Sequence, residues 1–232
     1  MTYSHPSIVV HVPPTQDPNP GIQCALSRIQ LQYGIDALDM AAEGPADPDR
    51  LSTGSLSLDH AIGGGIPLGR VTEIFGPEGT GKTTLALNII REAQKLGGIG
   101  LFVDSEHAFS PSYASLLGID LHRLLICRPD CAETALSVIQ EVLASRIASV
   151  IVIDSVAALV PKAERDANFN QPGPDDLARL LSGTLRKLIG PLRASGAALI
   201  LLNQLRTKLA RCLATPKRRQ EEEPFAITRR FA

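Results

Sequence analysis

The chain has 232 residues, of which 44% are hydrophobic, and this is enough to bury a full core, either as one large domain or as one domain with appendages. Its formal net charge of −1 gives no general attraction to nucleic acid, so any DNA binding must depend on local basic patches. We expect no membrane span, because no apolar stretch is long enough, and no signal peptide, because the first residues lack its basic and apolar segments.

Cysteine and histidine usage indicates no metal cluster. The four cysteines form no C-x-x-C pair, and the five histidines are scattered along the chain. We therefore expect free thiols in a reducing cytoplasm.

The beginning of the chain reads as an extension followed by a short helix. Residues 1–20 carry several prolines and little periodicity, so we expect a flexible extension with at most a short strand over 8–10. Residues 25–33 look helical, because Leu26, Ile29 and Tyr33 share one face, and residues 44–48 read as a linker. Such an isolated helix must pack against something, and the pattern leaves open whether this is a neighbouring subunit or its own domain.

Beyond a turn-rich segment at 51–70, apolar strands alternate with amphipathic helices. We predict strands over 71–75, 99–104, 124–127, 150–154 and 197–202. We predict helices over 85–96, 132–143 and 177–192. The continuous apolar run at 150–153 is typical of a strand that is buried on both faces of a parallel sheet. The alternation predicts an α/β fold with a mainly parallel central sheet flanked by helices.

A glycine-rich loop lies between the first of these strands and its helix. It reads Gly76-Pro77-Glu78-Gly79-Thr80-Gly81-Lys82-Thr83-Thr84 and has the form G-x-x-x-x-G-K-[ST]. Glycines let successive backbone N–H groups converge on an anion, and the following helix directs its positive end to the same place. In such a loop Lys82 reaches the β- and γ-phosphates and the Thr83 hydroxyl ligates Mg²⁺. The loop therefore predicts nucleotide binding.

Acidic residues follow two of the predicted strands, where open α/β sheets bind their ligands. Asp154 ends an apolar strand, as a Mg²⁺-orienting acid does, although aspartates also occur at strand ends for structural reasons. Glu106 is a candidate base for activating water against the γ-phosphate. Spacing alone does not distinguish Glu106 from Asp104, or from a solvated acid.

Several segments resemble the bacterial RecA recombinase family. They are Leu51–His60, Gly76–Thr84, Asp104–Ala108, Val152–Glu164 and Asn203–Gln204. The similarity runs from about Ala25 to about Arg206. It implies a P-loop NTPase fold and a cytoplasmic, DNA-dependent ATPase that polymerises into filaments on single-stranded DNA. It also implies pairing with homologous double-stranded DNA, strand exchange in recombination and repair, and self-cleavage of the SOS repressor after DNA damage.

The resemblance also implies roles for individual residues. The loop Gly76–Thr84 would hold ATP, and Asp154 would be the second acid of the Mg²⁺ site beside Thr83. Glu106 would be the general base, and Tyr113 would stack on the adenine. Gln204 would sense the γ-phosphate and pass that state to the DNA-binding loops.

DNA contacts are implied for a loop at about 166–174 and for the helix that follows it. Arg179 and Arg186 match basic residues that meet the phosphate backbone, and we group Arg206 with them. The first two lie seven residues apart and so share one helix face. Such cations bind phosphate without reading sequence. Pattern alone would favour a solvated helix face. The helix at 25–33 would dock on the next subunit of the filament.

The chain departs from the family in three places. The loop at 167–174 is richer in proline, and Ser110 stands where the family commonly has an acid near the adenine. After Arg206 the family's second DNA loop is not recognisable, and a charged stretch follows. We therefore expect the final core strands and the C-terminal domain to be absent, which leaves an open sheet edge. Coupling of hydrolysis to DNA is open for the same reason.

We thus expect four segments. They are an extension (1–24), a docking helix and linker (25–50), a RecA-like ATPase core (51–206) and a divergent charged tail (207–232). The first interpretation is an ATP-dependent DNA recombinase. The second is an ATP-binding regulatory or capping subunit of recombinase filaments that turns over nothing. The third is another RecA-fold ATPase that has lost its DNA contact.

Overall fold

The computed structural model describes residues 20–34, 38, 47–166, 176–204 and 226–229. The chain divides into two compact units, Met1–Asp47 and Pro48–Ala232. The described helix of the first unit is α1 (Pro20–Tyr33), which begins before the expected start at Ala25. The strand considered over 8–10 lies outside the described residues. No helix in the described part of the chain is long and apolar enough to cross a membrane.

The second unit is built on a six-stranded sheet with the order β5-β4-β6-β7-β3-β8. The strands are β3 (Val71–Gly76), β4 (Gly100–Asp104), β5 (Leu124–Cys127), β6 (Val150–Asp154), β7 (Ala198–Gln204) and β8 (Ala226–Arg229). Neighbouring strands from β5 to β3 run parallel, and β8 pairs antiparallel with β3. The prediction of a mainly parallel sheet flanked by helices is confirmed.

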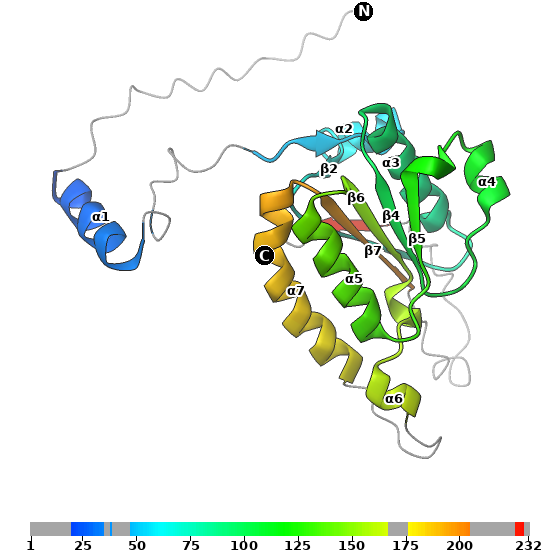
Figure 1. Ribbon diagram of the computed structural model, residues 1–232. Coiled ribbons are helices and arrows are strands. Elements are labelled where there is room, and N and C mark those ends of the chain that lie inside the picture. The colour runs from blue at the N-terminus through cyan, green and yellow to red at the C-terminus, as the bar shows by residue number, and fades with distance from the viewer. Residues whose placement is uncertain (1–19, 35–37, 39–46, 167–175, 205–225, 230–232) are drawn as a thin grey trace, which may run out of the picture. The chain divides into compact units, whose positions relative to one another are not determined.

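Helices cover both faces of this sheet. On one face lies α3 (Lys82–Lys95), and on the other α5 (Ala132–Ser145) packs beside α7 (Asp176–Ser195), as Figure 1 shows. Successive residues of a strand point to opposite faces. Val152 therefore packs in the core under α3, whereas Ile151 and Ile153 pack in the core under α5 and α7. Burial on both faces explains why β6 reads as a continuous apolar run.

Shorter elements connect the strands. They are β1 (Arg50–Leu51), α2 (Leu56–Ala61), β2 (Ile66–Pro67), α4 (Pro111–Leu116), the 3₁₀ turns η1 (Leu121–Arg123) and η2 (Val156–Ala158), and α6 (Lys162–Asp166). β1 and β2 form a small antiparallel pair. The Asp59 carboxylate in α2 accepts hydrogen bonds from the Ser52 and Thr53 hydroxyls, each at 2.6 Å, and this holds the turn-rich segment together.

Two expectations about the helices need correction at their ends. α3 begins at Lys82 rather than Leu85, because Gly81 has a φ of 84° and is the N-cap. α7 continues to Ser195 and includes Pro191. The predicted end at 192 rested on leucine spacing, which stops before the last polar turn of the helix.

The expectation of an open sheet edge is wrong at β3. Residues Ala226–Arg229 form β8, which pairs with Thr72–Phe75. This strand lies in the segment that was expected to be a charged tail. Its apolar and β-branched residues, Ala226-Ile227-Thr228, are a short strand signal that the neighbouring charges obscured.

Thr72 provides a test of core packing in β3. Its side chain is 1% exposed, and its hydroxyl is the one buried side-chain polar atom without a hydrogen-bond partner in the described part of the chain. We expect Thr72→Val to raise the free energy of unfolding by about 1 kcal/mol, because an unpaired buried hydroxyl is replaced by a methyl group. The melting temperature should rise by roughly 2–4 °C in calorimetry. As a control, Thr134→Val at an exposed position of α5 should not raise the melting temperature. A lower melting temperature for Thr72→Val would contradict the conclusion that the Thr72 hydroxyl is buried without a hydrogen-bond partner.

Candidate functional site

The glycine-rich loop connects the end of β3 to the start of α3. Gly79 and Gly81 have φ angles of 76° and 84°, a left-handed conformation that residues with side chains rarely adopt. Residues 77–81 are exposed. The first N–H groups of α3 have no partner within the helix and point toward this exposed loop. The loop therefore has the backbone geometry that an anion requires.

Lys82 folds back over the same loop. Its ammonium Nζ donates to the carbonyl oxygens of Gly76 at 3.1 Å and Pro77 at 2.7 Å, and the residue is only 9% exposed. A lysine ammonium carries three N–H donors. Two of these hold the loop, and the third can meet a phosphate oxygen. Lys82 can therefore stabilise the loop and bind an anion at the same time.

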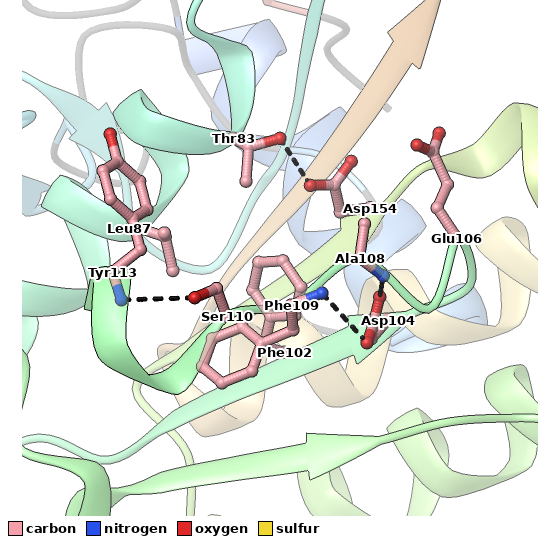
Figure 2. Close-up of a pocket in the computed structure, with 10 residues that line it drawn as sticks. All are labelled: Thr83, Leu87, Phe102, Asp104, Glu106, Ala108, Phe109, Ser110, Tyr113 and Asp154. Carbon is pink, nitrogen blue, oxygen red and sulfur yellow. Dashed lines mark hydrogen bonds between the residues drawn. The ribbon is translucent and has the colours of Figure 1, made fainter. Parts of the chain in front are cut away.

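Thr83 and Asp154 meet at the edge of the pocket shown in Figure 2. The Thr83 hydroxyl donates to Asp154 Oδ2 at 2.6 Å, although the two residues lie in α3 and at the end of β6. Burial raises the pKa of Asp154; the Thr83 hydrogen bond opposes this, and the charges of Glu106 and Asp104 add to it. The folded state therefore holds a proton here more tightly than the unfolded chain does, and this group's contribution to stability falls as pH rises through the raised pKa. A hydroxyl beside a partly buried carboxylate suits Mg²⁺, whose charge would offset that cost.

The two acids that spacing left open, Asp104 and Glu106, have different surroundings in the structure. Asp104 is 2% exposed, and its carboxylate accepts from the backbone N–H groups of Ala108 at 2.9 Å and Phe109 at 3.3 Å. It also pairs with Arg128 at 3.3 Å. These contacts hold the loop after β4. Both acids line the pocket, but Glu106 is exposed, and we therefore take it as the better candidate for a base.

Glu106 is held from two other strands. Its Oε1 accepts from Gln204 Nε2 at 3.0 Å and from Ser155 Oγ at 2.5 Å. Gln204 is the last residue of β7, and Ser155 follows the last residue of β6. Glu106 and Gln204 were predicted as site residues, but neither their contact nor Ser155 was predicted. Its position directly after Asp154, at the carboxyl end of a strand, is the signal that could have found it.

The pocket beside these groups has a volume of about 210 Å³. Its lining consists of Thr83, Leu87, Phe102, Asp104, Glu106, Ala108, Phe109, Ser110, Tyr113 and Asp154 (Figure 2). The rings of Phe102 and Phe109 lie 5.3 Å apart and form an apolar floor. These apolar lining residues could not be recognised from the sequence, because in a strand or helix pattern they look like ordinary core residues.

Tyr113 lies in α4 at the far end of this pocket from Glu106 (Figure 2). It is 40% exposed, and its hydroxyl hydrogen-bonds with the Thr84 hydroxyl at 3.0 Å. Ser110 is the N-cap of α4 and accepts from the Tyr113 backbone N–H at 3.3 Å. The serine that replaces an expected acid therefore has a structural contact of its own.

Arg179 and Arg186 lie away from this pocket, on the exposed face of α7. Together with Ala178, Ser182 and Gly183 they line a shallow surface hollow of about 480 Å³. Leu188 and Leu192 lie on the opposite side of α7, in the core. Arg206 and the expected DNA loop at 167–174 lie outside the described residues.

Comparison with known proteins agrees with this geometry. The RecA N-terminal domain family matches residues 21–221, a longer stretch than the resemblance at 25–206 suggested. A protein named RecA from Crocosphaera subtropica is 43% identical over 202 residues, which cover 87% of this chain and 58% of that protein. RecA proteins from Chlorobium limicola and Allorhizobium ampelinum are each 46% identical, over 84% and 88% of this chain and 57% of their own length.

The chain thus spans less than three fifths of the length of these curated relatives. The match nevertheless covers the glycine-rich loop, every residue that lines the pocket, and both arginines of α7. Its extent, together with the parallel sheet, shows that the chain belongs to the RecA family.

Proposed function

We propose that this chain is a DNA-dependent ATPase that acts in homologous recombination and DNA repair. The observation that carries the proposal is the meeting of the glycine-rich loop, the Thr83–Asp154 pair and Glu106 at the carboxyl ends of parallel strands. Membership of the RecA family supports ATP as the nucleotide and single-stranded DNA as the polymer.

ATP binding would use the loop and the pocket together. Backbone N–H groups from Gly79 to Thr83 and the Lys82 ammonium would hold the phosphates. Thr83 and Asp154 would hold Mg²⁺, which supplies charge neutralisation for the phosphate oxygens. Tyr113 would stack on the adenine, with its hydroxyl fixed by Thr84.

Hydrolysis would depend on Glu106 as the general base. The two hydrogen bonds from Gln204 and Ser155 reach Oε1, so Oε2 would accept the proton of the attacking water. The Gln204 amide donates to Glu106 in this structure and could donate to a γ-phosphate oxygen instead. Such an exchange would let Gln204 report the nucleotide state to the segment that follows β7.

DNA binding would use the exposed arginines of α7. We expect the double change Arg179→Ala and Arg186→Ala to weaken binding to single strands by removing two phosphate contacts. The slope of log K against log salt should then become shallower by about 1.4. Fluorescence anisotropy with a labelled oligothymidine measures this slope.

A control with the same loss of charge tests whether position matters. Lys95→Ala with Arg146→Asn removes two cations from exposed sites outside α7, and asparagine tolerates the left-handed backbone at position 146, where φ is 54°. The control should keep the slope of the unchanged protein. If the unchanged protein, the α7 variant and the control variant all gave the same slope, the proposal that α7 contacts DNA would be contradicted.

The wider activities belong to the same proposal. We propose self-association into helical filaments on single strands through the helix at 25–33, pairing with homologous duplex, a cytoplasmic location and action on the SOS repressor. DNA-stimulated ATP turnover and electron microscopy of filaments test the proposal. No stimulation and no filaments on single strands would overturn it. ATP binding without turnover would instead support a regulatory or capping subunit.

A further inference from the structure

Ser155 donates a side-chain hydrogen bond to Glu106, the candidate base. Its side chain is 1% exposed, and its hydroxyl donates to Glu106 Oε1 at 2.5 Å. An O–H···O⁻ contact of this length is a charge-assisted hydrogen bond, among the stronger kinds in proteins. A buried hydroxyl also has few alternative acceptors. The contact therefore fixes the Glu106 carboxylate, although Glu106 itself is exposed and could otherwise rotate.

Ser155 is in turn fixed by Ser105. The Ser105 hydroxyl donates to the Ser155 carbonyl oxygen at 2.7 Å, and the Ser105 backbone N–H donates to the Asp154 carbonyl oxygen at 3.0 Å. These bonds continue the pairing of β4 with β6 beyond its last register pair, Asp104 with Asp154. We call Ser105 and Ser155 the serine bridge. It connects the end of β6, which carries Asp154, to the loop after β4 that carries Glu106.

The two residues that donate to Glu106, Gln204 and Ser155, differ in whether they can take another hydrogen-bond partner. Gln204 is half-buried at the end of β7, and its amide could donate to a phosphate oxygen in place of Glu106. Ser155 is buried and cannot reach out of the site in the same way. When Gln204 changes its partner, Ser155 remains the donor to Oε1 and leaves Oε2 available to accept a proton.

We infer that Ser155 is a positioning residue for the hydrolytic step, and that Ser105 supports it. The water proton passes to Glu106 Oε2, and the Ser155 hydroxyl keeps its own proton throughout. This inference rests on the proposed function, because it takes Glu106 as the base. It assigns a role to two hydroxyls that the reaction itself does not consume.

The first test separates turnover from binding. Ser155→Ala should lower the DNA-stimulated kcat by about 10- to 100-fold, the equivalent of one hydrogen bond to a charged group. KM for ATP and the affinity for a fluorescent ATP analogue should stay the same, because Ser155 does not line the pocket. Ser105→Ala, which keeps its backbone N–H bond, should lower kcat less. Ser145→Ala, on the exposed end of α5, should leave kcat unchanged.

A double-mutant cycle distinguishes positioning from a general structural effect. If Ser155 acts through Glu106, Ser155→Ala should cause no further loss in a protein that already carries Glu106→Gln. An equal loss in both backgrounds would overturn the inference. So would a kcat for Ser155→Ala within twofold of the unchanged protein.

Crystal structures of the unchanged protein and of Ser155→Ala give a readout that does not need activity. We expect the Glu106 carboxylate to leave its position, or to occupy several rotamers, in the variant only. An unchanged Glu106 in Ser155→Ala would overturn the inference. Absence of turnover in the unchanged protein would instead overturn the proposed function, and the position of Glu106 would still decide the role of Ser155.

Discussion

Lys82→Ala is expected to abolish ATP turnover and to weaken ATP binding by about 100-fold or more. The ammonium is the one cation of the loop, and it would meet the β- and γ-phosphates at a site that it already helps to shape. Without it, the phosphate charge would be met by backbone N–H groups and Mg²⁺ alone. Phosphate release and titration with a fluorescent ATP analogue measure the two effects.

The control for this change lies at the other end of the same helix. Lys95→Ala removes the same charge, but Lys95 is exposed and pairs with Glu92 at 2.8 Å. It should bind and turn over ATP normally. Because Lys82 also donates to the carbonyls of Gly76 and Pro77, circular dichroism should first establish that the Lys82 variant is folded. Nucleotide affinity equal to that of the Lys95 variant would contradict the role of Lys82.

Glu106→Gln is expected to lower turnover by about 10²- to 10⁴-fold, while ATP affinity changes by no more than about twofold. A glutamine keeps an oxygen that can accept from Ser155 and Gln204, so the side chain can stay in place. What it loses is the ability to take a proton from water. Single-turnover phosphate release measures the chemical step, and analogue binding measures affinity.

The neighbouring acid provides the comparison for this second prediction. Asp104→Asn should lower the melting temperature, because the buried carboxylate anchors two backbone N–H groups and Arg128. Glu106→Gln should leave the melting temperature nearly unchanged, since Glu106 is exposed. If Asp104→Asn stopped turnover without destabilising the protein, and Glu106→Gln had no effect, the base would have been assigned to the wrong acid.

Much of the fold could be predicted because local pattern and tertiary environment agree. β6 has the predicted bounds, because a continuous apolar run is typical of a strand that is buried on both faces, and the edge strand β5 also has the predicted bounds. β8 could not be predicted in the same way. Its pairing with β3 depends on a partner more than a hundred residues away, and the charged residues before it are typical of a solvated tail.

The candidate site divides along the same line. The sequence by itself determined the glycine-rich loop, because left-handed glycines, a lysine and a threonine at these spacings carry their geometry within one short segment. Only the tertiary structure decided that Ser155 and Gln204 donate hydrogen bonds to Glu106. It also decided that the Asp104 carboxylate accepts from the backbone of the loop that follows it. These contacts join the ends of β4, β6 and β7. The order in which parallel strands lie side by side depends on packing of the whole sheet and leaves no signal in any one of them.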